Sequence, residues 1–323
     1  MPSFRDHVKD AAFRLLGSHA IVRAKLRAIE RSGLVTILNL HRVAPEDGSS
    51  YPPLAPQLFD ALLGFVKQHF EVVTFGTMAQ PTDRPRLILS FDDGYADFFD
   101  HAMPILERHG LRANQNIIPA CIERGEPPLN VIMQDFIGRA PRPALRSLKV
   151  DGFPFDGDRE DRMALGNRMS SFLKTQTIAV QNRLREALLP QLARVAEFRA
   201  TPMMSLEQVR RAASVHEIGA HSFEHASLGL ESDDYLRDDL RRCRAWFDSR
   251  LGTPLSIYAV PNGSYRPGQV EILRAEGIAQ VLLVEEDFTP ADGDLHRRFT
   301  FDAASLHELR FRATGGWRWP TRR

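Results

Sequence analysis

The chain has few cysteines, no long apolar run and almost no surplus of charge of either sign. Among 323 residues only Cys121 and Cys243 are cysteines, in neither a CxxC pair nor a Cys/His metal spacing, so the sequence allows one disulfide at most. The 42 Lys and Arg residues nearly cancel the 41 Asp and Glu residues, whereas a protein that binds nucleic acid through its phosphates carries a basic surplus. No stretch approaches the ~20 apolar residues of a transmembrane helix. We therefore expect a globular protein that does not bind nucleic acid.

The first 33 residues are more basic than the rest of the chain. Seven Lys and Arg residues stand against three acids in residues 1–33, and the apolar residues between them recur at helical spacing. This pattern predicts a basic amphipathic helical arm, which can lie on an anionic membrane surface or pack on the outside of a domain. The basic residues also interrupt any apolar run of signal-peptide length, so the sequence predicts a cytoplasmic protein.

Segments of strand and helix character alternate along residues 34–314. The apolar runs at 34–40 and 86–91 have the length and composition of strands, and residues 56–70 between them have a helical pattern. Alternation of this kind is typical of an α/β fold with a parallel sheet and crossover helices. In such folds the chemistry collects at the carboxyl ends of the strands.

Residues 124–201 interrupt that alternation. Two helix-like stretches at about 163–174 and 178–194 are present, but no clear buried strand is. We predict an α-helical insertion that projects from the barrel, with substrate selection and structural cover both open as its role. The insertion is basic, with twelve Lys and Arg residues against seven acids between Arg139 and Arg199. Residues 315–323 form a short aromatic and basic tail.

Two clusters of polar residues follow strand-like segments. Asp92 and Asp93 come directly after an apolar strand, where two adjacent carboxylates are unfavourable unless positive charge lies nearby. His221 and His225 follow a later strand, and their i, i+4 spacing places them on one face if the segment coils. Two histidines and one carboxylate, with positions left open to water and substrate, are the usual ligands of a catalytic zinc site. Together the two clusters indicate a metal site.

A third cluster, Pro261-Asn262-Gly263, follows the strand-like residues 256–260, although an ordinary turn explains these residues equally well. The chain closely resembles the polysaccharide deacetylases of carbohydrate esterase family 4, the NodB-homology domain. The resemblance rests on three motifs that occur in this order: Ser-Phe-Asp-Asp-Gly, His-Ser-x-x-His and Pro-x-Gly. Leu-His-Arg-Val at 40–43 and Glu-Ile-Gly-Ala-His at 217–221 are also similar to stretches of that family. The resemblance runs from about residue 35 to residue 309 and is interrupted by the insertion.

The resemblance implies a distorted (β/α) barrel that carries the helical insertion and the N-terminal arm. It also implies a divalent metal, usually zinc with cobalt or nickel as alternatives, and the removal of N-acetyl groups from amino sugars of a glycan. Asp92 matches the family's catalytic base. The residues that match the metal ligands are Asp93, His221 and His225. Pro261 and Asn262 fall on a groove motif in which the backbone N–H after the proline holds the oxyanion.

The sequence departs from many members of the family at two places. Position 259 is alanine where those members carry an arginine that orients the base, and the terminal histidine that serves as their general acid has no aligned counterpart. His296, one position off and before two arginines, and His41, at the end of the first strand, are the two candidates for that acid.

Three functions therefore remain open. The first is a metal-dependent N-deacetylase that acts on a polysaccharide, its precursor or a lipid-linked glycan. The second is a carbohydrate-binding barrel whose catalysis is weakened by the missing arginine and histidine. The third is a deformylase or other deacylase of a membrane-anchored sugar lipid, which the basic arm at residues 1–33 motivates.

Overall fold

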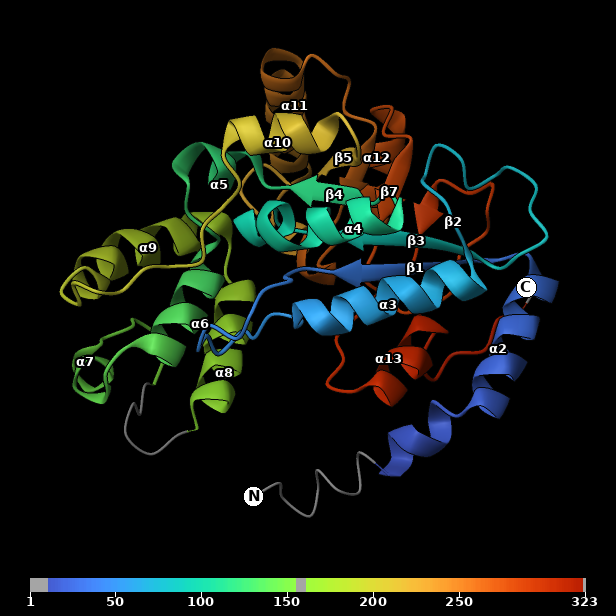
Figure 1. Ribbon diagram of the computed structural model, residues 1–323. Helices are drawn as coiled ribbons and strands as arrows, with labels where there is room; N and C mark the ends of the chain where they lie inside the picture. The colour runs from blue at the N-terminus through green and yellow to red at the C-terminus, as the bar shows by residue number, and fades with distance from the viewer. Residues whose placement is uncertain (1–10, 155–160, 322–323) are drawn as a thin grey trace.

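The computed structural model describes residues 11–154 and 161–321, and within them nine strands form one curled parallel sheet with helices packed around it (Figure 1). The strands are β1 (Val35–Leu40), β2 (Glu71–Val72), β3 (Arg86–Phe91), β4 (Asn114–Ile117), β5 (Glu217–Ala220), β6 (Ile257–Ala259), β7 (Gln280–Leu282), β8 (Leu295–His296) and β9 (Phe299–Thr300). Their order across the sheet is β8-β7-β6-β5-β4-β3-β1-β9, and β2 pairs with β3. The distorted α/β barrel expected from the sequence is confirmed.

One short segment joins the two edges of this sheet. His296 in β8 pairs with Leu282 in β7, and only three residues later Phe299 in β9 pairs with Leu38 in β1. Residues 295–300 thus contact the edge strands on both sides. The sequence did not predict β8 and β9, because a strand of two residues is too short to show an alternating pattern.

The inner face of the sheet changes from apolar to polar along the strands. Because successive side chains point to opposite faces, residues 35, 37 and 39 of β1 lie on the same side. Val35 and Ile37 belong to an apolar cluster with Ile88 and Leu282, whereas Asn39, the next residue on that face, lines a cavity. The polar end of the barrel interior therefore coincides with the carboxyl ends of the strands.

The helices around the sheet include α2 (His19–Ser32), α3 (Pro56–His69), α4 (Met103–His109), α5 (Pro119–Arg124), α10 (Leu206–Ala213), α11 (Asp233–Trp246), α12 (Pro267–Ala275) and α13 (Leu306–Ala313). The turn Phe98–Ala102, directly before α4, is π-helical. Pro104 lacks the N–H that a regular helix would bond to the carbonyl of residue 100, which explains the widened turn. Helix α4 ends at Gly110, whose φ of 66° lies in the left-handed region that glycine adopts readily.

The described residues of the insertion, 124–154 and 161–201, contain the end of α5 and four further helices, which lie beside the carboxyl ends of the strands at the left of Figure 1. They are α6 (Leu129–Arg139), α7 (Arg142–Ser147), α8 (Arg162–Lys174) and α9 (Ile178–Leu192). These helices have a hydrophobic core of their own, which includes Phe136, Leu165 and Leu188. The two stretches expected to be helical correspond to α8 and α9. The sequence did not indicate α6, of which nine of eleven residues are buried and which therefore lacks an amphipathic pattern.

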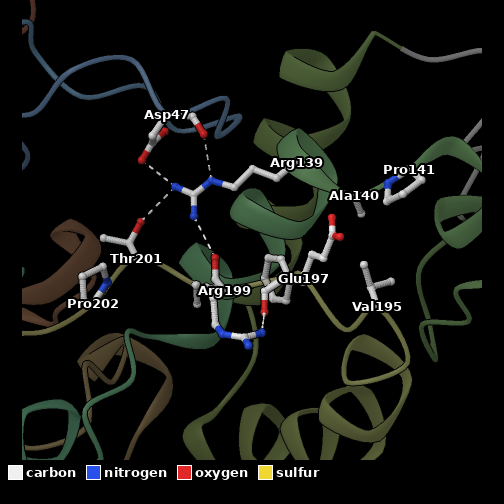
Figure 2. A pocket seen from close by; sticks show the side chains of 11 residues that line it. Asp47, Arg139, Ala140, Pro141, Val195, Glu197, Arg199, Thr201 and Pro202 are labelled. Atoms are coloured by element: carbon white, nitrogen blue, oxygen red, sulfur yellow. Dashed lines mark hydrogen bonds and ion pairs between the residues drawn. The ribbon is translucent and has the colours of Figure 1, made fainter.

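An arginine connects these helices to the barrel (Figure 2). Arg139, the last residue of α6, donates hydrogen bonds to the carbonyl oxygen and the carboxylate of Asp47, which lies in the loop after β1. It also donates to the carbonyl oxygen of Arg199 at 2.9 Å and to the hydroxyl of Thr201 at 3.4 Å. A cavity of about 570 Å³ lies beside this network. The start and the end of the helical segment are therefore held to the same loop of the barrel.

The described part of the N-terminal arm is helical at residues 11–16 and in α2. Val22, Lys25 and Ile29 on one face of α2 are buried against the protein. Residues 1–10 of the arm, 155–160 of the insertion and 322–323 of the tail lie outside the described residues. Within the described ranges, no helix combines the length and the hydropathy that crossing a membrane requires.

Candidate functional site

All but two of the predicted site residues line a cavity of about 440 Å³ at the carboxyl ends of the strands; the exceptions are Pro261 and His296. His41 follows β1, the pair Asp92 and Asp93 follows β3, and His221 follows β5. The residues of the helical insertion that line the same cavity are Asn130, Val131, Gln134, Asn167, Ser170, Ser171 and Lys174. One wall of the cavity therefore consists of the insertion, and six of its seven lining residues can form hydrogen bonds through their side chains.

Asp93, His221 and His225 form a buried cluster. The Asp93 Oδ1 atom lies 3.5 Å from His221 Nε2 and 3.6 Å from His225 Nε2. The other carboxylate oxygen, Oδ2, accepts a hydrogen bond of 2.7 Å from Tyr95 Oη, whereas Oδ1 has no hydrogen-bond partner. A buried carboxylate oxygen without a partner is unfavourable.

The donor atoms of this cluster fit a divalent metal ion. His221 Nδ1 lies 2.9 Å from the carbonyl oxygen of Ala259, which places the proton on Nδ1 and leaves the lone pair of Nε2 facing Asp93. The ligand atoms of the three residues all lie within 4.8 Å of one another. An ion at this place would satisfy the otherwise unpartnered Asp93 Oδ1 with two imidazole nitrogens, a donor set that suits zinc.

The two histidines approach each other through a turn rather than through a helix. Residues 221–225 contain no helical segment, and Ser222 and His225 have φ values of 58° and 64°. The condition under which the i, i+4 spacing would align the two rings, a coiled segment, is therefore not met. Buried Asp239 of α11 stabilises the turn, because its carboxylate accepts hydrogen bonds from the Ser222 hydroxyl and the Phe223 N–H, each 2.8 Å long.

Strained backbone is concentrated at this site. Among the described residues, four other than glycine have positive φ, namely Asp93, Ser222, His225 and Asn262. Three of the four line the cavity, and Ser222 lies between the two histidines. Such conformations persist only where surrounding contacts enforce them, and they often occur at active and binding sites.

Asp92 is paired with an arginine that the sequence analysis did not identify. The Nη1 and Nη2 atoms of Arg298 each lie 2.8 Å from one oxygen of the Asp92 carboxylate, and Asn116 Nδ2 donates a third bond of 2.8 Å. Arg298 is completely buried, and it also donates to Asn39 Oδ1 and to the carbonyl oxygen of Leu283. Burial raises the pKa of Asp92, but the attraction of Arg298 outweighs it and holds the pKa below its ordinary value.

The position of Arg298 explains why it was missed. It stands between β8 and β9, in the segment that joins the two edges of the sheet. The adjacent Arg297 has the same residue type, and only the short strands on either side decide which of the two side chains points into the barrel. Position 259 is alanine, and its carbonyl oxygen contacts His221. The arginine that faces Asp92 thus comes from the segment between β8 and β9.

The two candidates for a general acid lie in different environments. His41 lines the cavity, and burial lowers its pKa although Asp93 and Asp92 oppose that shift. His296 is not among the cavity-lining residues; its Nδ1 lies 3.2 Å from the Thr289 hydroxyl and its Nε2 contacts the Gln280 side chain. The pairing of β8 with β7 places His296 at the sheet edge, so only His41 reaches the cavity.

The groove motif is divided between the wall of the cavity and the protein interior. Asn262 lines the cavity with φ 57°, and its Nδ2 donates a hydrogen bond of 3.1 Å to the Ser227 hydroxyl. Pro261 is buried and begins a short 3₁₀ turn. The Ser227 hydroxyl also donates to the carbonyl oxygen of Lys174, at 2.7 Å, and so links this motif to the end of α8.

Lys174 brings a positive charge from the insertion to the cavity. It is the last residue of α8, and its side chain remains in contact with solvent. Loss of hydration lowers the pKa of Lys174, and the Asp93 carboxylate opposes that shift. The amine therefore lies within electrostatic reach of the Asp93–His221–His225 cluster.

Residues 174–281 match the family model described as polysaccharide deacetylase. The fold is similar to that of IcaB from Ammonifex degensii, with a TM-score of 0.57 and 17% identity over 87% of this chain and 97% of that chain. The resemblance to the polysaccharide deacetylase family that the sequence motifs indicated is confirmed.

Two further solved structures have a similar fold. The Streptococcus pyogenes deacetylase PplD, in complex with acetate, has a TM-score of 0.53 and 16% identity over 83% of this chain and 92% of that chain. BC0361, a polysaccharide deacetylase from Bacillus cereus, has a TM-score of 0.55 and 11% identity over 87% of this chain and 69% of that chain. None of the curated proteins matches the chain.

Proposed function

We propose that this protein is a metal-dependent hydrolase that removes N-acetyl groups from the amino sugars of a glycan. The observation that carries the proposal is the buried Asp93–His221–His225 cluster with an unpartnered carboxylate oxygen, next to the paired carboxylate of Asp92. The three clustered residues would hold zinc, or cobalt or nickel in its place. When bound, such an ion polarises an amide carbonyl and makes water a stronger nucleophile.

Asp92 is the proposed catalytic base. Its Oδ2 lies 3.9 Å from His221 Nε2, beside the ligand cluster, so it can accept the proton of a water that attacks the acetyl carbon. Arg298 and Asn116 fix the orientation of the carboxylate and keep it ionised. One argument for the alternative, a carbohydrate-binding barrel with weakened catalysis, was the absence of an arginine at position 259. Arg298 contacts the Asp92 carboxylate in its place, so this argument no longer holds.

Asn262 and His41 are proposed to act on the amide oxygen and on the leaving nitrogen, respectively. The backbone N–H of Asn262, in the cavity wall, would donate to the oxygen that becomes negative during attack on the amide. His41 would donate a proton to the leaving amine, a role supported by its place in the cavity. Amide hydrolysis needs this last proton because an amine anion is a very poor leaving group.

The proposed substrate is an N-acetylated glycan. PplD was solved with acetate, which is the product that N-deacetylation releases, and this supports the same chemistry for the present cavity. The amide and hydroxyl side chains of α6 and α8 provide donors and acceptors for a ligand rich in hydroxyl groups. A lipid-linked glycan, or a sugar lipid carrying a formyl or another acyl group, remains a second candidate substrate because of the basic N-terminal arm.

Elemental analysis combined with an acetate-release assay on N-acetylglucosamine oligomers tests the proposal. We expect one divalent ion per chain, and loss of acetate release after chelation with recovery on addition of zinc, cobalt or nickel. Asp92→Asn should retain the ion and lose activity by a factor of about 10²–10⁴, because it removes the base and leaves Asp93, His221 and His225 in place. His221→Ala should lose the ion as well.

Two results together would overturn the mechanism: purified protein that binds none of these ions, and acetate release that Asp92→Asn leaves unchanged. Glycan binding without acetate release across a broad substrate panel would instead favour the binding-barrel alternative.

A further inference from the structure

The N-terminal helices and the C-terminal tail expose large apolar side chains on one surface. Within the described residues, the large hydrophobic side chains that are exposed are Leu15, Met163, Leu230, Leu306, Trp317 and Trp319. Four of these six belong to residues 11–33 or 306–321, and Trp317 is 75% exposed. We call residues 11–33 together with 306–321 the terminal surface.

Contacts between side chains make the terminal surface continuous. The rings of Phe13 and Phe311 lie 5.8 Å apart, and the rings of Phe311 and Trp317 lie 4.9 Å apart. The Lys25 ammonium donates to the carbonyl oxygen of Gly316 and lies 5.8 Å from the ring of Trp319. The tail therefore packs beside α2, so the two ends of the chain form one structural unit.

The apolar face of α2 is used inside the protein. Val22, Lys25 and Ile29 are buried, so this helix has no apolar face left to insert into a membrane as the sequence pattern suggested. The side chains left in solvent include His19, Arg23, Arg27 and Arg31, which follow one another at four-residue steps and therefore form a stripe along one side of the helix.

The terminal surface also concentrates positive charge. Residues 11–33 and 306–321 contain eight Lys and Arg residues and two Glu residues, in a chain whose formal net charge is +1. Glu308, one of the two acids, is buried and paired with Arg312. The charge that this surface presents to a partner is therefore almost entirely positive.

We propose that the terminal surface docks on an anionic lipid bilayer. The basic stripe of α2 and Arg318 lie against the headgroups, while Trp317 and Trp319 enter the interface between headgroups and acyl chains. Tryptophan favours this depth because its ring is apolar and its N–H remains hydrated. A purely ionic partner such as a nucleic acid would match the arginines but would give the exposed Leu15, Leu306 and tryptophan side chains no apolar environment.

This inference does not rest on the proposed deacetylase activity. In Figure 1, α2 and α13 lie at the right and the insertion beside the cavity lies at the left. No residue of the terminal surface lines the cavity, so substitutions in this surface leave the cavity lining unchanged.

Tryptophan fluorescence and vesicle sedimentation test the docking. The chain has three tryptophans, and Trp246 is buried, so a Trp246→Phe background leaves only the two tail residues as reporters. With vesicles of phosphatidylcholine and phosphatidylglycerol at a ratio of about 7:3, we expect sedimentation with the lipid and a blue shift of the emission. With phosphatidylcholine alone, or at high salt, both effects should be much weaker.

Two matched pairs of substitutions distinguish binding through the terminal surface from nonspecific attraction between the protein's positive charges and the lipid. Arg23→Gln with Arg27→Gln should weaken partitioning about 30-fold, from ~1 kcal/mol for each basic residue near the lipid. Arg237→Gln with Arg241→Gln removes two exposed arginines at the same spacing on α11 and should leave partitioning unchanged. Trp317→Ala with Trp319→Ala should weaken binding in the unaltered Trp246 background.

Three outcomes would overturn the proposal. They are the absence of binding to anionic vesicles at low salt, equal weakening by the α2 and α11 pairs, and binding without a blue shift of the tail tryptophans. Acetate release from water-soluble oligomers should be the same in all of these variants. A failure of docking with normal acetate release would refute the surface alone, whereas the reverse result would refute the deacetylase proposal alone.

Discussion

Asp92 and Arg298 illustrate how much one residue pair depends on the fold around it. Both side chains are almost completely buried, and each oxygen of the carboxylate receives one N–H of the guanidinium. The acid could be predicted because two adjacent aspartates after an apolar strand are unusual. The arginine could not, since 206 positions separate it from its partner along the chain.

Removing Arg298 should affect stability and activity together. Arg298→Ala leaves a buried carboxylate unpaired, and we expect a loss of about 3–5 kcal/mol in the free energy of unfolding together with loss of acetate release. Arg298→Lys keeps the charge but not the two parallel bonds, so an intermediate loss is expected. Denaturant unfolding and acetate release measure the two effects.

A double variant separates the structural from the catalytic contribution. Arg298→Ala combined with Asp92→Asn removes the unpaired charge, so it should recover part of the stability while remaining inactive. Full stability and full activity in Arg298→Ala would show that the contact does not position the base.

At the scale of elements, the helical insertion supplies a wall of the cavity as well as a core of its own. Helices α8 and α9 could be predicted from their patterns, whereas α6 could not, because its buried residues surround it on nearly every side. The turn at residues 221–225 was also not predictable, since left-handed residues such as Ser222 are selected by the contact with Asp239 and not by local sequence. Substrate selection was one of the two roles left open for the insertion, and a substitution of Lys174, the last residue of α8, tests it.

Lys174→Gln should weaken substrate binding without affecting stability. The side chain is in contact with solvent and lines the cavity, so its loss removes a charged hydrogen-bond donor but no buried packing. We expect KM to rise between about 10-fold and 100-fold, in line with the ~1.5–3 kcal/mol of a hydrogen bond to a charged group. Lys149→Gln is the matched control, because Lys149 is exposed on the same insertion but does not line the cavity. Equal effects of the two substitutions would refute a direct contact with the substrate.

At the scale of the whole molecule, buried histidines away from the catalytic cavity should set the pH range of stability. Burial lowers the pKa of His216 and of His296 to about 4 each, from an ordinary value of about 6.5. Between these values the unfolded chain binds protons that the folded chain does not. The free energy of unfolding should therefore be fully maintained above pH ~6.5 and should fall as the pH is lowered toward ~4.

Denaturant unfolding at a series of pH values measures this dependence. His296→Gln should reduce the slope between pH ~4 and ~6.5, because one of the two groups no longer takes up a proton on unfolding. His19→Gln, on the exposed side of α2, should leave the slope unchanged. A slope that His296→Gln does not alter would contradict this account.

The closing segment 295–300 has a consequence for the order in which the protein acquires activity during synthesis. Asp92, Asp93, His221 and His225 emerge from the ribosome before the residues of β8 and β9, and a nascent chain could assemble the ligand cluster while the sheet is still open along one side. Arg298 arrives last, on the segment that pairs with both edge strands. Until that segment docks, Asp92 lacks its guanidinium partner. The chain should therefore assemble the proposed metal-binding residues first and orient the proposed base only when the barrel is complete.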